Sequence, residues 1–224
     1  MKGLMIKDLC LLRNQGKSML LMLAIGLFME VQMGAGTIIW FLTFLGAMLA
    51  SGTANYDEFD NGFSFLFTLP ITRRQYVREK YAFSVLFVLF CLGVSSLLSL
   101  VLSPLSGRGT SIGLSDILFM SSMGILISGF LLATVLPLRL KFGSEQSRIV
   151  WILFFLVITA LIVGGRELFR RANSLEAFQN LSAAFKALNS WSAGQILAMC
   201  TVVSLVLLLI SEQISERIVM KKEY

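Results

Sequence analysis

Between Thr37 and Tyr56 the sequence reads TIIWFLTFLGAMLASGTANY, a stretch without Asp, Glu, Lys or Arg. About 20 apolar residues in a helix are long enough to cross the hydrocarbon core of a bilayer. Similar stretches recur on both sides of this one. Over all 224 residues the chain is 56% hydrophobic and 14% charged, whereas soluble domains carry roughly 25% charged residues. The sequence therefore predicts an all-α integral membrane protein.

Six apolar segments are predicted to be transmembrane helices, at residues 18–34, 37–55, 81–102, 114–137, 149–165 and 192–211. Six spans of about 20 residues leave roughly 100 of the 224 residues for two tails and five loops. No catalytic domain of ordinary size fits in that remainder. We therefore expect one transmembrane domain that covers residues 1–224.

The basic residues are distributed unequally between the two predicted sides of the membrane. One side holds Lys2, Lys7, Arg13, Lys17, Arg73, Arg74, Arg78, Lys80, Arg139, Lys141, Arg148, Arg217, Lys221 and Lys222, and the other holds Arg108, Arg166, Arg170, Arg171 and Lys186. Cytoplasmic loops carry the excess of Lys and Arg, so both termini are predicted to be cytoplasmic. A cleaved signal peptide is the competing interpretation, but the long first apolar stretch, which contains Glu30, favours a retained span.

Composition excludes several classes of function. The chain has no histidine, and Cys10, Cys91 and Cys200 lie far apart, so neither a Ser-His-Asp triad nor a zinc site is predicted. No Gly-x-x-x-x-Gly-Lys-Ser/Thr sequence occurs, so this chain is not expected to bind nucleotide phosphates. An intramembrane protease would need Glu/His metal ligands or paired aspartates within spans. We predict no catalytic residue, metal or cofactor in this chain, and no nucleic-acid partner.

The N-terminal residues 1–17 have the pattern of an amphipathic helix. Leu4, Met5, Leu9 and Leu12 recur at helical spacing, and basic residues occupy other positions of the helix. This pattern is typical of a helix that lies in the membrane interface, here on the cytoplasmic side.

The loop at 56–80 combines acidic and aromatic residues. Its first part contains Asp57, Glu58, Phe59, Asp60, Phe63, Leu66, Phe67 and Pro70, with the phenylalanines at i, i+4 and i+8. This spacing predicts a short helix that ends at Pro70. Thr72 and Gln75 then form a capping box that starts the helix of the third span. The phenylalanines fit either a lipid surface or the groove of a cytosolic partner, and the residues alone leave both open.

Two stretches carry a resemblance to a known family. Leu69-Pro70-Ile71-Thr72-Arg73 with Val77 and Lys80, after Tyr56-Asp57-Glu58, resembles the small six-helix permeases of type 2 ABC exporters (ABC-2 type). The opening Met1-Lys2-Gly3-Leu4, with Lys7-Asp8-Leu9 and Arg13, is similar to theirs too.

The resemblance implies a partner and a cargo. The 57–70 segment would be the coupling helix and 1–17 a connecting helix, both in contact with a separate cytoplasmic ATPase subunit that holds ATP and Mg²⁺. The chain would act with a second permease copy or homologue in a bacterial plasma membrane. The cargo would be an amphipathic peptide, such as a bacteriocin, or a similar amphiphile. The alternative is a substrate-binding membrane subunit or immunity protein without its own ATP-driven cycle.

Charged residues at the outer side give two further hypotheses. Glu30 lies roughly 20 Å along the first span from Lys17. It either reaches outer water or belongs to the translocation path or a subunit contact. The outer segment at 166–189 is predicted to contain an amphipathic helix. Its residues Arg166, Arg170 and Arg171 are candidates to pair with lipid phosphates at the outer surface.

Overall fold

The computed structural model describes residues 2–57, 72–102, 113–172 and 192–221, although the side chains of residue 2 and of most residues after 143 in the third range lie outside the description. Six helices form these ranges, without a strand among the residues described: α1 (Lys2–Asn14), α2 (Gly16–Met33), α3 (Thr37–Tyr56), α5 (Arg73–Leu102), α6 (Leu114–Ala172) and α8 (Ala193–Lys221). The expected all-α membrane fold is confirmed.

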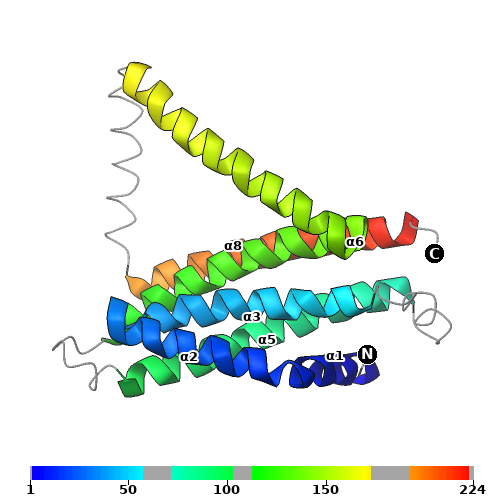
Figure 1. Cartoon of the computed structure of the whole chain (residues 1–224), viewed down its shortest axis with the longest axis horizontal. Helices are drawn as coiled ribbons and strands as arrows, with labels where there is room; N and C mark the ends of the chain where they lie inside the picture. The colour runs from blue at the N-terminus through cyan, green and yellow to red at the C-terminus, as the bar shows by residue number, and fades with distance from the viewer. Residues whose placement is uncertain (1, 58–71, 103–112, 173–191, 222–224) are drawn as a thin grey trace.

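Five helices in the described part are long and apolar enough to cross a membrane: α2, α3, α5, the stretch Leu114–Gly143 of α6, and α8. The expected fifth span, 149–165, falls in the second part of α6, beyond a change of direction at Gly143 (Figure 1). Gly143 has φ of 79°, a left-handed conformation that glycine adopts without steric cost. The helix continues past Pro137, where the predicted fourth span ends, up to the change of direction at Gly143.

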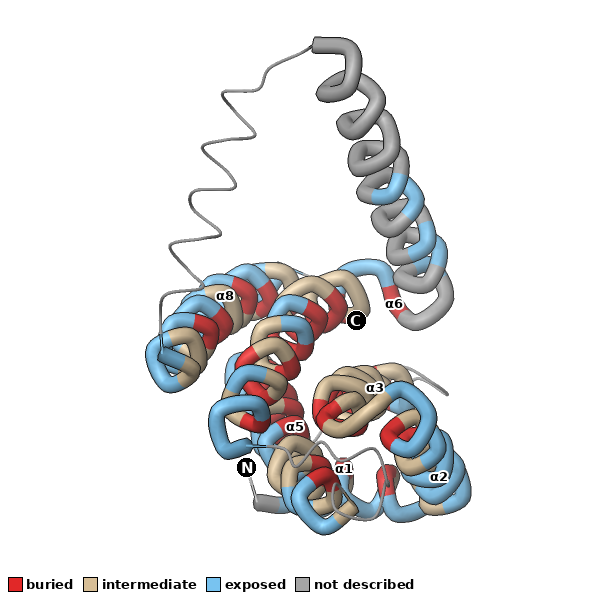
Figure 2. The backbone as a smooth tube through the Cα atoms, turned by 90° about the vertical axis from the view of Figure 1, so that its left-hand side faces the viewer, coloured by how far each residue is buried: buried red, intermediate tan, exposed pale blue. Residues whose placement is uncertain are grey.

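The bundle is packed around α3. This helix packs against both α5 and α6, and α8 packs against α6, so that the helices run side by side along the long axis (Figure 1). The core contains Leu4, Ala47, Tyr76, Val77, Tyr81, Val88, Leu131, Leu132, Val135, Leu136, Leu140 and Val219. Buried positions lie where the helices face one another, whereas much of α2 and α8 is exposed (Figure 2). The exposed residues of these two helices include large apolar ones such as Leu20, Phe28, Leu205 and Leu209. Apolar residues on the outside are what a lipid environment requires.

A capping box is present at the start of two helices, α5 and α8. The Thr72 backbone N–H donates to Gln75 Oε1 at 3.1 Å, and the Gln75 N–H donates back to Thr72 Oγ1 at 3.3 Å. The predicted capping box is therefore confirmed at the start of α5. Ser192 and Gln195 form the same pair of bonds, 3.0 and 3.4 Å long, at the start of α8.

The predicted N-terminal helix forms as α1 and contacts the nearby ends of α3 and α5. Its buried face consists of Leu4, Asp8 and Leu12, spaced four residues apart. Leu9, which we expected on the same apolar face, is 60% exposed. The difference arises because a charged residue, Asp8, occupies the centre of the buried face, where it meets a cation from α5.

Candidate functional site

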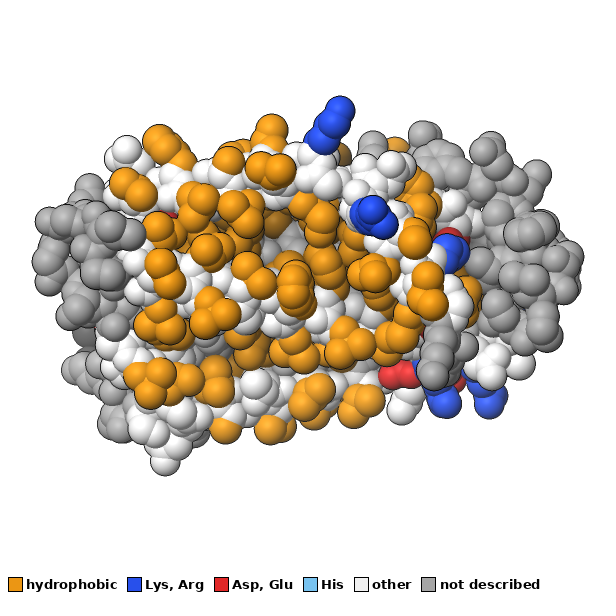
Figure 3. All heavy atoms as spheres, turned by 90° about the horizontal axis from the view of Figure 1, so that it is seen from below, with side chains coloured by type: hydrophobic (Ala, Val, Ile, Leu, Met, Phe, Trp, Pro, Cys, Tyr) orange, Lys and Arg blue, Asp and Glu red, His pale blue; other side chains and the backbone are white. Residues whose placement is uncertain are grey.

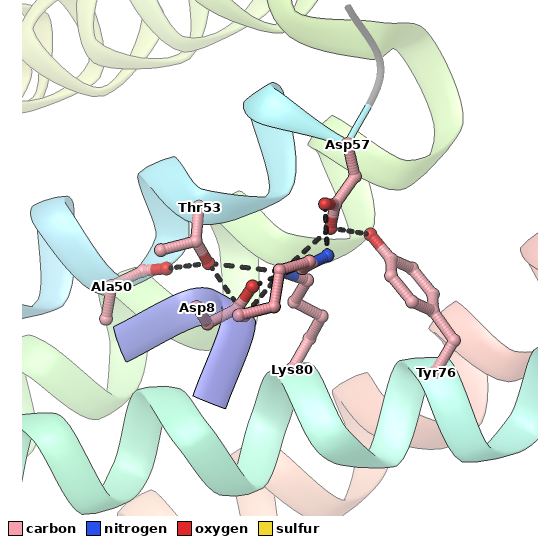
Figure 4. A network of polar contacts seen from close by, with 7 residues as sticks. Asp8, Ala50, Thr53, Asp57, Tyr76 and Lys80 are labelled. Atoms are coloured by element: carbon pink, nitrogen blue, oxygen red, sulfur yellow. Dashed lines mark hydrogen bonds and ion pairs between the residues drawn. The ribbon is translucent and has the colours of Figure 1, made fainter. Parts of the chain in front are cut away.

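A buried group of charged and polar side chains joins α1, α3 and α5 at one end of the bundle (Figure 4). We call it the ionic cluster and define it as Lys7, Asp8, Thr53, Asp57, Tyr76 and Lys80. The side chains of Asp8, Asp57 and Lys80 are 0%, 5% and 1% exposed. Ions are rarely buried to this degree, because each loses several kcal/mol of hydration free energy.

Lys80 is the centre of the ionic cluster. Its Nζ lies 2.5 Å from Asp8 Oδ2, 2.8 Å from Asp57 Oδ2 and 3.3 Å from Thr53 Oγ1. An ammonium group has three N–H donors, so each donor of Lys80 has one acceptor. These acceptors come from α1, from α3 and from the residue that follows α3, and α5 supplies the lysine. One side chain therefore holds three helices together.

A second cation completes the charge balance. Lys7 Nζ donates to Asp57 Oδ1 and lies 3.6 Å from Asp8 Oδ1, while the Tyr76 hydroxyl donates to Asp57 Oδ2 at 2.9 Å. Burial alone would raise the pKa of the Asp57 carboxyl, but the ammonium groups of Lys80 and Lys7 hold that pKa below its ordinary value. The ionic cluster thus contains two lysines and two aspartates, so that its formal charges balance.

Glu79 differs from its neighbour Lys80. It is 1% exposed, yet neither of its carboxylate oxygens has a hydrogen-bond partner among the residues that the structure describes. No group of three or more His, Cys, Asp or Glu that could hold a metal ion occurs among the residues that the structure describes. What the ionic cluster does show is a set of ion pairs and hydrogen bonds that joins α1, α3 and α5.

Two members of the ionic cluster, Asp57 and Lys80, flank the 58–71 segment in the sequence. Asp57 is the last described residue before this loop, and Lys80 lies in the first part of the helix that follows it. The ion pair between them, 2.8 Å long, fixes the two ends of the loop to each other, and Asp8 fixes both to α1. A force applied to the loop would therefore reach three helices at once.

A family model described as an ABC-2 family transporter protein matches residues 3–220. The chain belongs to the ABC-2 family. It is a multi-pass transmembrane subunit of an ABC transporter, and ABC-2 permeases work with an ATPase subunit that is not part of them. The resemblance noted in residues 1–17 and 56–80 is thus confirmed at the level of the family. Comparison with curated proteins and with solved structures found no match.

Most of the site residues that we predicted for this ABC-2 permease are outside the described residues. Asp57 is described and belongs to the ionic cluster. The rest of the expected coupling segment, from Glu58 to Pro70, lies outside the described ranges, as does the expected outer helix in 173–191. Arg166, Arg170 and Arg171 fall within α6 near its end, but their side chains are not described. Their expected contacts with an ATPase and with lipid phosphates stay predictions.

Glu30 caps the neighbouring helix of the permease. Its side chain, 1% exposed, accepts bonds from the Gly36 N–H at 2.8 Å, the Ile38 N–H at 2.9 Å, the Ser99 hydroxyl at 2.6 Å and the Thr37 hydroxyl at 3.2 Å. The first N–H groups of a helix have no partner inside it, and a carboxylate satisfies them well. Glu30 therefore does not reach outer water. Its membership of a translocation path stays a prediction.

Some members of the ionic cluster, but not their contacts, could be recognised from the sequence. Lys7, Asp8, Asp57 and Lys80 all lie in the stretches that resemble the family, but we did not predict that they contact one another. Asp8 lies between Leu4 and Leu12 on one helix face, which marks it as buried once that face is known to pack. Nothing in the sequence marks Thr53 and Tyr76 as members of the ionic cluster, since the chain contains many other hydroxyl side chains.

Proposed function

We propose that this ABC-2 permease exports an amphipathic peptide or a similar amphiphile, in a pair with a second permease copy or homologue. A separate ATPase supplies the energy by binding the 57–70 segment. The observation that supports coupling through this segment is the ionic cluster, which fixes both ends of the loop to α1, α3 and α5. ATP-driven movement of the loop would thereby become movement of the membrane helices.

The charge distribution within the spans supports an amphiphilic cargo and an ATP-driven cycle. The six predicted spans contain only two charged residues, Glu30 and Asp116. Glu30 is engaged in capping α3, and Asp116 accepts a bond from the Gly113 N–H at 3.1 Å at the start of α6. Ion-coupled transporters generally rely on ionisable groups within the membrane that face the transport path. Both acids here have structural tasks instead.

Replacing Phe63 and Phe67 together with Asp should weaken binding of the ATPase more than tenfold and abolish transport. Apolar anchors in a groove contribute at least about 2 kcal/mol each, and a carboxylate in their place would be buried without a partner. Co-purification of the ATPase encoded nearest to the permease measures the effect. The Phe63→Leu/Phe67→Leu variant is the control, since it keeps the apolar side chains. Normal association and transport in the Asp variant would refute the coupling segment.

Both termini of the permease are proposed to be cytoplasmic, because most basic residues lie on their side of the membrane. A reporter that fluoresces only in the cytoplasm should therefore be active when it is fused after Tyr224. The same reporter inserted in the 103–112 loop should be inactive. Activity in the loop and none at the C-terminus would invert the proposed topology.

A further inference from the structure

Two apolar hollows border the same strip of α5. The larger, about 390 Å³, lies between α1 and α5 and is lined by Leu9 of α1 and by Phe83, Leu86, Phe87 and Phe90 of α5, among others. The second, about 290 Å³, lies between α2, α3 and α5 and shares Phe87 and Phe90 with the first. Because Phe87 and Phe90 line both, the two hollows are neighbours along α5, and we refer to them together as the apolar groove.

The groove faces away from the rest of the chain. Leu9, Leu86 and Phe90 are 60%, 57% and 64% exposed. Phe90 lies about 15 Å along α5 from Lys80, at 1.5 Å per residue. That distance equals roughly half of the 30 Å hydrocarbon core. The α5 residues that line the first hollow, from Phe83 to Phe90, therefore lie in the half of the predicted span nearer to Lys80, over about 10 Å of helix.

The charges beside the groove are positive. The two acids of α1 and α2, Asp8 and Glu30, are 0% and 1% exposed and are both held by partners within the chain. Arg13 and Lys17, in contrast, are exposed. Arg13 follows Leu9 by four residues, so it lies one helical turn from the groove on the same face of α1. Seen from this side, apolar side chains cover the surface and the basic ones lie in the right-hand half (Figure 3).

We propose that this groove binds an anionic phospholipid, with an acyl chain along Leu9, Phe83 and Phe87 and the phosphate held by Arg13 and Lys17. An apolar groove with a basic rim matches the two parts of such a lipid, whereas a zwitterionic lipid offers no net charge to the rim. The bound lipid would fill the space between α1 and α5 and so hold α1 in place beside the ionic cluster. This lipid is distinct from the cargo, and its binding does not depend on the proposed export.

The charge part of the proposal can be tested on the purified full-length permease in mild detergent, with native mass spectrometry and added phosphatidylglycerol or phosphatidylcholine. We expect the parent to retain phosphatidylglycerol preferentially. Arg13→Gln/Lys17→Gln should weaken phosphatidylglycerol binding about fivefold for each charge removed, with phosphatidylcholine unaffected. Arg13→Lys/Lys17→Arg keeps both charges and should bind as the parent does. Arg217→Gln/Lys221→Gln removes two exposed charges from α8 and is the matched control.

The apolar part has its own variant. Leu9→Trp should fill the hollow between α1 and α5 and so lower the retention of phosphatidylglycerol. The control is Leu209→Trp on α8, at a residue that is 58% exposed, and it should leave retention unchanged. Equal retention of the two lipids by the parent, or unchanged phosphatidylglycerol binding in the Arg13/Lys17 Gln variant, would overturn the proposal. Equal losses in the α8 controls would overturn the site, and normal retention in Leu9→Trp would overturn the placement of the acyl chain.

Discussion

Replacing Lys80 with Met should lower the free energy of unfolding by about 3–5 kcal/mol, the cost of removing one partner from a buried ion pair. Asp8 and Asp57 would stay buried, 0% and 5% exposed, with Lys7 as their remaining cation. Thr53 would also lose a bond. Thermal unfolding of the purified permease measures the loss. Transport should disappear as well, because α5 would lose its ion pairs to Asp8 of α1 and to Asp57 at the start of the proposed coupling segment.

Glu79→Gln is the matched control for this experiment. Glu79 is adjacent to Lys80 and equally buried, but its carboxylate oxygens have no hydrogen-bond partner in the described part of the chain. Removing its charge should therefore not lower the unfolding temperature. The double variant Asp8→Asn/Lys80→Met should lose less than the sum of the two single variants, since both remove the same contact. A Lys80→Met protein as stable as the Glu79→Gln protein would show that the ionic cluster does not hold the helices together.

Glu30→Leu should destabilise the permease by at least about 3 kcal/mol, because hydrogen bonds to a charged group are worth about 1.5–3 kcal/mol each. The substitution removes the acceptor for the Gly36 and Ile38 N–H groups and for the Ser99 hydroxyl. These donors would then be buried next to a leucine. We expect a large fall in the unfolding temperature, together with loss of the fixed angle between α2 and α3.

The Glu30→Gln variant tests whether Glu30 acts through its capping hydrogen bonds or through its negative charge. Glutamine keeps one acceptor oxygen but turns an NH₂ group toward donors, so its cost should be intermediate. Transport measured on the folded fraction then tests the translocation path. Normal transport per folded molecule in Glu30→Gln would assign Glu30 to capping alone, whereas lost transport at normal stability would place its charge in the path. Normal stability of Glu30→Leu would contradict the capping role.

The membrane fold could be predicted from the sequence because its determinants are local. Apolar runs near 20 residues mark spans, and the Thr72–Gln75 capping box needs only residues three apart. The break of α6 was harder to place. Pro137 is the residue expected to end a helix, but the helix continues to Gly143, where φ is 79°. A proline in a membrane helix is tolerated when its surroundings satisfy the freed carbonyl, and a glycine offers a conformation that other residues avoid.

The ionic cluster could not be predicted because its partners are far apart in the sequence. Lys80 and Asp8 are separated by 72 positions, and Lys7 and Asp57 by 50. Charge counting placed all four residues on one side of the membrane but did not pair them. Glu30 shows the same limit. An acid in a span was recognisable as energetically costly. Its hydrogen-bond donors were not, because they are two backbone N–H groups at the start of the next helix and the hydroxyl of Ser99, 69 positions away.

The order in which the ionic cluster is completed has a consequence for biogenesis. Synthesis delivers Asp8 first, then Asp57, and the central cation Lys80 last, at the start of the third transmembrane helix. Until that helix emerges from the ribosome, Lys7 is the one cation of the ionic cluster, and α1 can reach α3 through Thr53 and Asp57 but not α5. A nascent chain that stalls before Lys80 thus carries an N-terminal helix that is held by fewer contacts than in the finished protein.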